Sequence, residues 1–249
     1  FSFFSQYLSV LKGQISPYPY FLHAKKTSAG EIVLITGSTN GTGSQIALNF
    51  ASLGATLVLW DMDNEGNKET GRLAQKNGHK RQEHLLKLSV YPFFIQVRKE
   101  VGDVTLLINN AGILLGEKFC DILDADFEKT LRVNFLSQVW TCKAFLPAMM
   151  ISNRGRLVST TSAAGLLGVY SILCWNLRFM YHAGKQGIKT TIICPYFINT
   201  EFAKAFQTNH LFLPVYDAEY VAHKIMDAIQ KQKFYLIIPL TLHFLAFKM

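Results

Sequence analysis

Residues 31–43, EIVLITGSTNGTG, decide the fold of this chain. Residues 32–35 are a continuous run of apolar, mostly β-branched side chains, which indicates a strand buried on both faces of a parallel sheet. The run ends in a loop that contains Gly37, Gly41 and Gly43, and an apolar-periodic helix follows. Strand, glycine loop and helix together present backbone N–H groups and a helix N-terminus to a pyrophosphate.

Asp61 strengthens the interpretation of this loop as a dinucleotide site. It follows a second buried run, residues 56–60, and lies 24 residues after Gly37. A carboxylate there accepts hydrogen bonds from the adenosine ribose and repels a 2′-phosphate, so NAD is expected and NADP is less favoured. The alternative for Asp61 is a strand-end or N-cap residue, because the polar helical segment MDNEGNKE follows it.

Strands and helices alternate from residue 31 onward, which is typical of a doubly wound parallel sheet of the Rossmann type in a single α/β domain. Beyond the first two strands, further strands are expected at residues 83–90 (weakly marked), 105–109, 156–160, 190–194 and 235–238. Helices are expected at residues 64–76, 92–101, 124–149 and around 221–229.

Two of these helices have a predicted core face. In the helix at residues 124–149, the face consists of Phe127, Leu131, Phe135 and Val139. In the last helix, it consists of Val221, Ile225, Ala228 and Ile229.

Composition narrows the function classes. At 249 residues and 49% hydrophobic content, the chain is long enough for one large α/β domain with a sizeable core. The formal net charge is +8, but the lysines are scattered, so nucleic-acid binding is not expected. A basic surface suits an anionic dinucleotide or an anionic membrane face. The four cysteines have no C-x-x-C or metal-ligand spacing, which indicates reduced thiols and no metal site.

The domain organisation is expected to be simple. Residues 1–30 are expected to form a leader outside the fold with a membrane-proximal segment, and residues 31–249 the dinucleotide-binding domain. The apolar tail, residues 234–249, begins with the expected last strand. Its remainder is open to two interpretations, a packed C-terminal segment or a segment in a membrane interface.

The glycine loop TGSTNGTG, Asp61 and the motif NNAG at residues 109–112 together resemble the short-chain dehydrogenase/reductase family over roughly residues 30–240. The segments EVGDVTLLINNAGI, TCKAFLPAMM, SAAGLLGV and GIKTTIICPYFINT are similar to one branch of it. That branch contains the epidermal retinol dehydrogenases and the microsomal or lipid-droplet hydroxysteroid 17-beta dehydrogenases. Its members oxidise or reduce lipophilic alcohols and ketones and usually carry a hydrophobic membrane anchor at the N-terminus.

The resemblance assigns cofactor contacts to several positions. The pyrophosphate would lie against Gly37, Gly41 and Gly43, and the adenosine ribose against Asp61. Three residues of the motif after the fourth strand would border the cofactor and steady the central strand: Asn109, Ala111 and Gly112. Pro195 and Thr200 would flank the nicotinamide.

The resemblance also assigns two residues of the proton relay. Asn134 matches the asparagine of the catalytic helix, which holds a water in that relay; the alternative is a solvated helix asparagine. Ser162 matches the serine that hydrogen-bonds the substrate oxygen, although the hydroxyl side chains before it in STTSAAG resemble it.

The family's proton carrier is missing from its expected place. A tyrosine acts there as general acid/base, and a lysine one helical turn later lowers its pKa from ~10. Aligned without a gap from Ser162, those positions hold Trp175 and Phe179, which cannot move a proton. A Y-x-x-x-K pair exists at Tyr181 and Lys185, but it lies close to the next strand. Tyr170 is another phenol, without a lysine four residues later.

Two crossovers between strands are shorter than the family pattern, one within residues 78–102 and one within 175–188. Two function hypotheses therefore stand: an NAD-dependent oxidoreductase of lipophilic alcohols, and a catalytically impaired relative that binds the cofactor or a membrane. A poorly folding product is a third. The resemblance implies a lipophilic substrate, allows a homodimer, and places the chain at the endoplasmic reticulum membrane or a lipid droplet, facing the cytosol, or otherwise in the cytoplasm.

Overall fold

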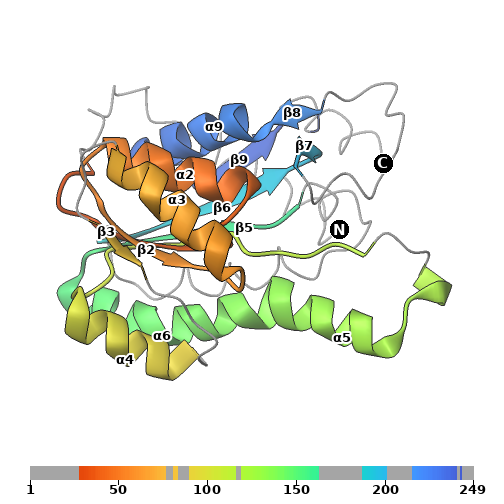
Figure 1. The fold of residues 1–249 in the computed structure, drawn as a ribbon, viewed down its shortest axis with the longest axis horizontal. Coiled ribbons are helices and arrows are strands. Elements are labelled where there is room, and N and C mark those ends of the chain that lie inside the picture. The colour runs from red at the N-terminus through yellow and green to blue at the C-terminus, as the bar shows by residue number, and fades with distance from the viewer. Residues whose placement is uncertain are drawn as a thin grey trace, which may run out of the picture.

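A parallel sheet forms the centre of the computed structural model, with strand order β3-β2-β1-β4-β5-β6-β9 (Figure 1). The structure describes residues 28–76, 81–83, 90–115, 119–162, 187–200, 215–239 and 242. The strands are β1 (Ile32–Thr36), β2 (Thr56–Trp60), β3 (Arg81–Glu83), β4 (Leu106–Asn109), β5 (Gly155–Thr160), β6 (Ile188–Pro195) and β9 (Tyr235–Ile238). All neighbouring strands of this sheet pair in parallel, as the alternating pattern predicts.

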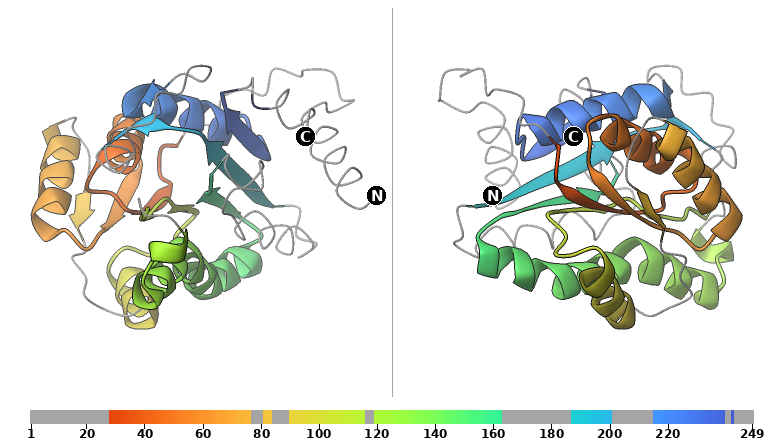
Figure 2. Two further views of the ribbon diagram at one scale, coloured as in Figure 1. Left: turned by 90° about the vertical axis from the view of Figure 1, so that its right-hand side faces the viewer. Right: turned by 60° about the vertical axis from the view of Figure 1, so that its left-hand side comes forward.

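Helices cover both faces of the sheet (Figures 1 and 2). One layer holds α2 (Gly41–Ser52), α3 (Asn64–Lys76) and α9 (Ala218–Gln230). The other holds α4 (Val90–Glu100), α5 (Asp124–Leu131) and α6 (Ser137–Ser152), with the short helix η1 (Phe119–Asp121) before α5. A pair of two-residue strands, β7 (Ile198–Asn199) and β8 (Tyr216–Asp217), precedes α9. None of the helices in these described ranges is long and apolar enough to span a bilayer.

Strand β1 shows why the apolar run folds as it does. Val33, Leu34 and Ile35 are completely buried, because successive side chains of a strand point to opposite faces and both faces are covered. Val33 and Ile35 pack with α2 and α9, whereas Leu34 packs with α4 and α6. Two core layers therefore meet at one strand, and full burial of each such side chain contributes about 1.5–3 kcal/mol.

Most of the predicted elements are confirmed. The strands predicted at residues 32–35, 56–60, 105–109, 156–160, 190–194 and 235–238 and the helix at 64–76 are observed with shifts of at most two residues. The face predicted for the last helix is buried in α9. The third strand begins before its predicted range, as β3, and residues 84–89 lie outside the described part of the chain. The second shortened crossover, within residues 175–188, also lies almost entirely outside the described part of the chain.

The core face predicted for the long helix at residues 124–149 is wrong. Phe127 is 42% exposed, and Leu131, Phe135 and Val139 are only partly buried. The side chains that α6 buries are Gln138, Thr141, Cys142, Ala144, Phe145 and Met149.

A π-helical segment explains the error. Residues Arg132–Leu136 form a π turn between α5 and α6, and its wider i→i+5 spacing rotates the faces of the two helices relative to each other. In addition, α5 reaches past the described strands at the right of Figure 1, so none of those strands covers it there. A single 3.6-residue period therefore cannot describe both helices.

A buried ion pair lies at the amino ends of the central strands, opposite the glycine loop. Arg156 Nη2 lies 3.3 Å from Glu31 Oε1, and the two side chains are only 7% and 4% exposed. Burial alone would raise the pKa of Glu31. However, the hydrogen bond from Thr105 and the nearby guanidinium charges outweigh burial and lower that pKa below its ordinary value. The ionised pair therefore ties the start of β1 to β5.

Glu31→Gln should destabilise the fold by about 3 kcal/mol, because it leaves the Arg156 charge buried without a counter-charge. Urea unfolding at neutral pH measures the difference from the unaltered chain. The stabilisation exists above the unfolded-state pKa of the glutamate, about 4.3. It is lost as the pH falls through the lower folded-state pKa, so the difference should shrink in acid.

Glu128→Gln is the matched control, since Glu128 is exposed on α5. It should change the free energy of unfolding by no more than about 0.5 kcal/mol. Equal effects of the two substitutions at neutral pH would contradict a stabilising role for the buried pair.

Candidate functional site

The candidate site lies at the carboxyl ends of β1 and β4, where the strand order reverses. Chain segments after β1 run to one side of the sheet and those after β4 to the other, which leaves a crevice between two adjacent strand ends. The glycine loop follows β1, and the segment with Asn109, Ala111 and Gly112 follows β4. The fold therefore brings together two motifs that are about 70 residues apart in the sequence.

Each glycine of the loop is required by a close contact. Gly37 has φ +69°, and a Cβ there would lie 2.8 Å from the Cα of Ala111. Gly41 has φ +56°, and a Cβ there would lie 2.8 Å from Cγ2 of Thr200. A Cβ on Gly43 would collide with the carbonyl oxygen of Gly37. The loop is therefore bare backbone packed against backbone, which is the form a pyrophosphate cradle takes.

The first turn of α2 completes this cradle. The helix begins at Gly41 and carries no acidic side chain in its first turn. The partial positive charge of a helix N-terminus is therefore not offset locally, and it favours an anion at this end.

Asp61 holds the loop rather than the helix that follows it. Its Oδ2 accepts a hydrogen bond from the backbone N–H of Thr39 (3.0 Å), and its Oδ1 accepts one from the N–H of Asp63 (3.1 Å). The N-cap role belongs to Asp63, whose Oδ1 accepts from the N–H of Gly66 in the first turn of α3. Asp61 keeps further lone pairs with which ribose hydroxyls could bond.

Asn110 and Thr36 join the two motifs, and the sequence analysis missed both. Asn110 Nδ2 donates to the carbonyl oxygens of Thr36 (3.3 Å) and Gly37 (3.1 Å). In return, Thr36 Oγ1 accepts from the backbone N–H groups of Asn110 and Ala111. The sequence did carry a signal for Asn110, because the NNAG motif has two consecutive asparagines, but only Asn109 was considered as a site residue.

Asn109 points away from the loop and into the protein. Its Oδ1 accepts from Thr141 Oγ1 (2.8 Å), and its Nδ2 donates to Cys142 Sγ (3.5 Å). Burial raises the pKa of the Cys142 thiol to about 12, so the sulfur stays protonated. The described side chain of Asn109 thus steadies β4 against α6, which is the second of the two roles that the resemblance implied.

Asn134 lies in the π turn and holds the strand extension after β4. Its Oδ1 accepts from the N–H of Ile113 and its Nδ2 donates to the carbonyl of Ile113, both at 2.8 Å. The side-chain amide therefore pairs with both backbone groups of one residue, Ile113. It is not a solvated helix asparagine, and its backbone carbonyl is a separate acceptor.

That carbonyl already has one partner. Gln138 Nε2 donates to the carbonyl oxygens of Asn134 and Thr160, both at 3.1 Å. Gln138 is buried and was also missed, since glutamine on a helix carries no motif of its own. Its amide fixes the π turn to the end of β5, two residues before Ser162, which is half-buried.

The last predicted cofactor residues lie at the end of β6. Pro195 is buried there, and Thr200 follows β7 with its methyl group against Gly41. The structure thus brings Thr200 to the loop after β1. The residues that bear on the proton carrier, Tyr170, Trp175, Phe179, Tyr181 and Lys185, lie outside the described residues.

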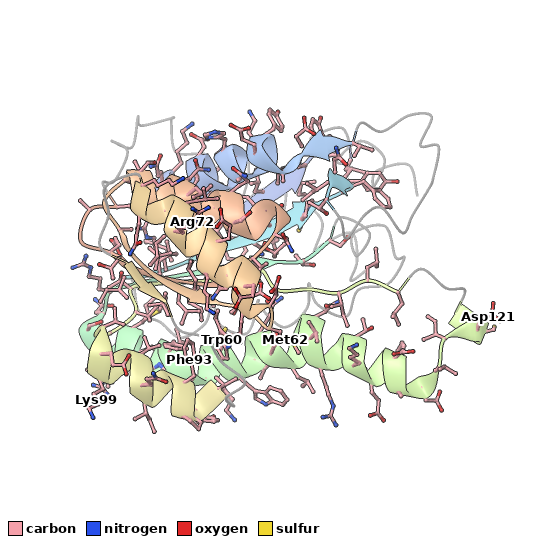
Figure 3. All side chains as sticks on the ribbon, in the orientation of Figure 1. Trp60, Met62, Arg72, Phe93, Lys99 and Asp121 are labelled. Atoms are coloured by element: carbon pink, nitrogen blue, oxygen red, sulfur yellow. The ribbon has the colours of Figure 1, made fainter. Side chains whose placement is uncertain are left out.

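The rim of the site beside Asp61 is open. Met62, two residues after β2, is 91% exposed, and the ring of Trp60 packs on that of Phe93 with 4.1 Å between the ring centroids (Figure 3). Over the parts of the chain that the structure describes, no group of three or more His, Cys, Asp or Glu side chains could hold a metal ion.

Comparisons with known proteins agree with this geometry. Residues 31–210 match the family described as short chain dehydrogenase. The chain is 43% identical over 242 residues to epidermal retinol dehydrogenase 2 of Homo sapiens, covering 90% of this chain and 78% of that protein. It is 38% identical over 232 residues to estradiol 17-beta-dehydrogenase 11 of Mus musculus, covering 86% and 77%.

A solved structure has the same fold. It is a short chain dehydrogenase/reductase from Burkholderia phymatum in complex with NAD, with a TM-score of 0.75 and 25% identity, and the match covers 87% of this chain and 92% of that chain. The resemblance to the retinol and hydroxysteroid branch is therefore confirmed.

Gly43→Ala should destabilise the chain by about 2–3 kcal/mol and abolish NADH binding, because its methyl group must displace the Gly37 carbonyl. Thermal unfolding and NADH fluorescence titration measure the two effects. Gly112→Ala is the control, since a Cβ there meets only Asn134 Oδ1 at an ordinary 3.5 Å. It should change stability by about 0.5 kcal/mol or less. Similar stability losses in both variants would contradict the close-packing argument.

Asn134→Asp should cost about 2 kcal/mol, because a carboxylate cannot donate to the Ile113 carbonyl and leaves that oxygen unpaired. Chemical unfolding measures the loss, and faster hydrogen exchange of the Ile113 amide would localise it. Asn64→Asp, at the exposed start of α3, removes the same amide and should be neutral or slightly stabilising. A neutral Asn134→Asp would contradict the anchoring role.

Proposed function

The chain belongs to the short-chain dehydrogenase family, and on that premise we propose that it is an NAD(H)-dependent oxidoreductase of lipophilic alcohols and ketones, of the retinol or hydroxysteroid type. The observation that carries the proposal is the close-packed glycine cradle, held beside Asp61 at the reversal of strand order. The described residues fit NAD, because the cradle offers bare backbone to a pyrophosphate and a carboxylate to the ribose.

The chain's own residues would bind and orient the reactants. Gly37, Gly41 and Gly43 would hold the pyrophosphate and Asp61 the adenosine ribose, with the lining completed by Asn109, Ala111, Gly112, Pro195 and Thr200. When bound, NAD supplies the acceptor or donor of a hydride. Ser162 would donate a hydrogen bond to the substrate oxygen, and the backbone carbonyl of Asn134 would hold a relay water. Hydrogen bonds to an oxygen on which charge develops favour the transition state.

The proton must still pass between the substrate oxygen and solvent. With Trp175 and Phe179 in the usual places, the phenol candidates are Tyr181, with Lys185, and Tyr170. The alternative function, a catalytically impaired relative that binds the cofactor or a membrane, rests on that substitution. It is less favoured, because the similar proteins are named as dehydrogenases.

Partners and location follow from the same proposal. The substrate would be lipophilic, and a homodimer and a membrane or lipid-droplet surface are the further proposed partners. We propose a cytosol-facing place at the endoplasmic reticulum membrane or a lipid droplet, with residues 1–30 as a leader and residues 31–249 as the dinucleotide-binding domain. The charge of +8 would favour an anionic surface.

Incubation with NAD and a panel of retinol and 17-beta-hydroxysteroids tests the activity, with NADH absorbance as the readout. Turnover is expected, and Ser162→Ala should lower kcat about a hundredfold with NADH affinity unchanged. Tyr181→Phe and Tyr170→Phe identify the proton carrier, since loss of turnover in one variant assigns the phenol.

Ser159→Ala is the control for Ser162→Ala. Ser159 lies on β5, three residues before Ser162, and its buried hydroxyl has no hydrogen-bond partner among the residues that the structure describes, so its loss should leave turnover unchanged. NADH binding without turnover on the whole panel would favour the impaired relative instead. A chain that binds neither NAD nor NADH would refute both functions.

A further inference from the structure

Two carboxylates lie beside the ribose end of the site, although cofactor choice was attributed to Asp61 alone. Asp61 and Asp63 flank Thr39, the third residue of the glycine loop. Asp61 Oδ2 accepts from the N–H of Thr39, while the backbone carbonyl of Asp63 accepts from Thr39 Oγ1 at 3.3 Å. The N–H of Asp63 in turn donates to Asp61 Oδ1. The three residues form one hydrogen-bonded unit.

The carboxylate of Asp63 also lies close to the Thr39 side chain. Gly66, in the first turn of α3, marks the point at which they meet. A Cβ on Gly66 would lie 2.6 Å from Asp63 Oδ2 and would collide with Thr39 Cγ2. Asp63 Oδ2 and Thr39 Cγ2 therefore lie close to the same position, so the Asp63 carboxylate is next to the glycine loop. The hydrogen bond from the Gly66 N–H to Asp63 Oδ1 holds the carboxylate in this place.

Cations do not neutralise this pair within the described residues. The loop side chains Ser38, Thr39 and Asn40 are uncharged. On α3, Lys68 Nζ pairs with Glu65 at 2.7 Å, and Arg72 pairs with Glu69 at 2.7 Å. Figure 3 shows Arg72 on α3, well away from Met62, which lies two residues after β2. Lys68 and Arg72 are thus engaged by glutamates of α3 itself.

We propose that Asp63 is a second determinant of cofactor choice, which excludes a dinucleotide with a 2′-phosphate independently of Asp61. The inference rests on the proposed function, since it places the adenosine ribose beside Asp61. A 2′-phosphate carries about −1.5 to −2 charges at neutral pH, so a second carboxylate at the same loop adds repulsion. Consequently, a substitution of Asp61 alone leaves NADP disfavoured.

Fluorescence titration with NADH and NADPH tests the proposal without requiring turnover. Asp63→Asn removes the charge but keeps an oxygen for the Gly66 N–H, because asparagine caps helices about as well as aspartate. It should tighten NADPH binding about fivefold and leave NADH binding within about twofold. In an Asp61→Ser background, Asp63→Asn should give a further gain for NADPH of similar size. The gain should decline at high salt, because ions screen exposed charges beyond about 10 Å at 0.1 M.

Glu65→Gln is the matched control, since Glu65 lies on the same helix turn with a side chain that is 83% exposed. It should change NADPH affinity by less than twofold. Equal NADPH gains in Asp63→Asn and Glu65→Gln, or an unchanged NADPH affinity in Asp63→Asn, would overturn the inference while NADH binding by the unaltered chain keeps the proposed function. Absence of NADH binding by the unaltered chain would overturn both.

Discussion

The close approach of Gly43 to the carbonyl oxygen of Gly37 is the contact on which the rest of the site depends. No side chain fits between the end of β1 and the first turn of α2, so the loop must fold back on its own backbone. That compact loop leaves room for Ala111 on one side and for Thr200 on the other. The segments that follow β4 and β7 are thereby brought to the same crevice.

Amide and hydroxyl side chains, rather than charges, hold the second half of the site. Asn110, Asn134 and Gln138 each bond to backbone groups of another segment, and each uses its amide for at least two contacts. A half-buried amide is costly when it is unpaired, so such double contacts specify one arrangement of loops. A buried ion pair, Glu31 with Arg156, instead lies at the opposite ends of the central strands.

The sequence predicted this architecture well where the pattern was local. Runs such as residues 32–35 and 56–60 fold as predicted because apolar β-branched side chains favour a strand that is covered on both faces. The stripe through Phe127 failed, since a π turn changes the helical phase and no local residue pattern announced it. Asp61 was assigned correctly to the loop end of β2, but whether it or Asp63 caps α3 depended on coordinates.

By itself, the sequence determined the fold class, the family and the places of the glycines, because these follow from periodicity and from motifs a few residues long. Only the tertiary structure decided which residue's backbone Asn134 holds, that Asn110 rather than Asn109 faces the loop, and that two carboxylates flank Thr39. The physical reason is that a hydrogen-bond partner is chosen by distance and direction in space. Residues that lie about 20 to 75 positions apart in the chain become neighbours only when the sheet has formed.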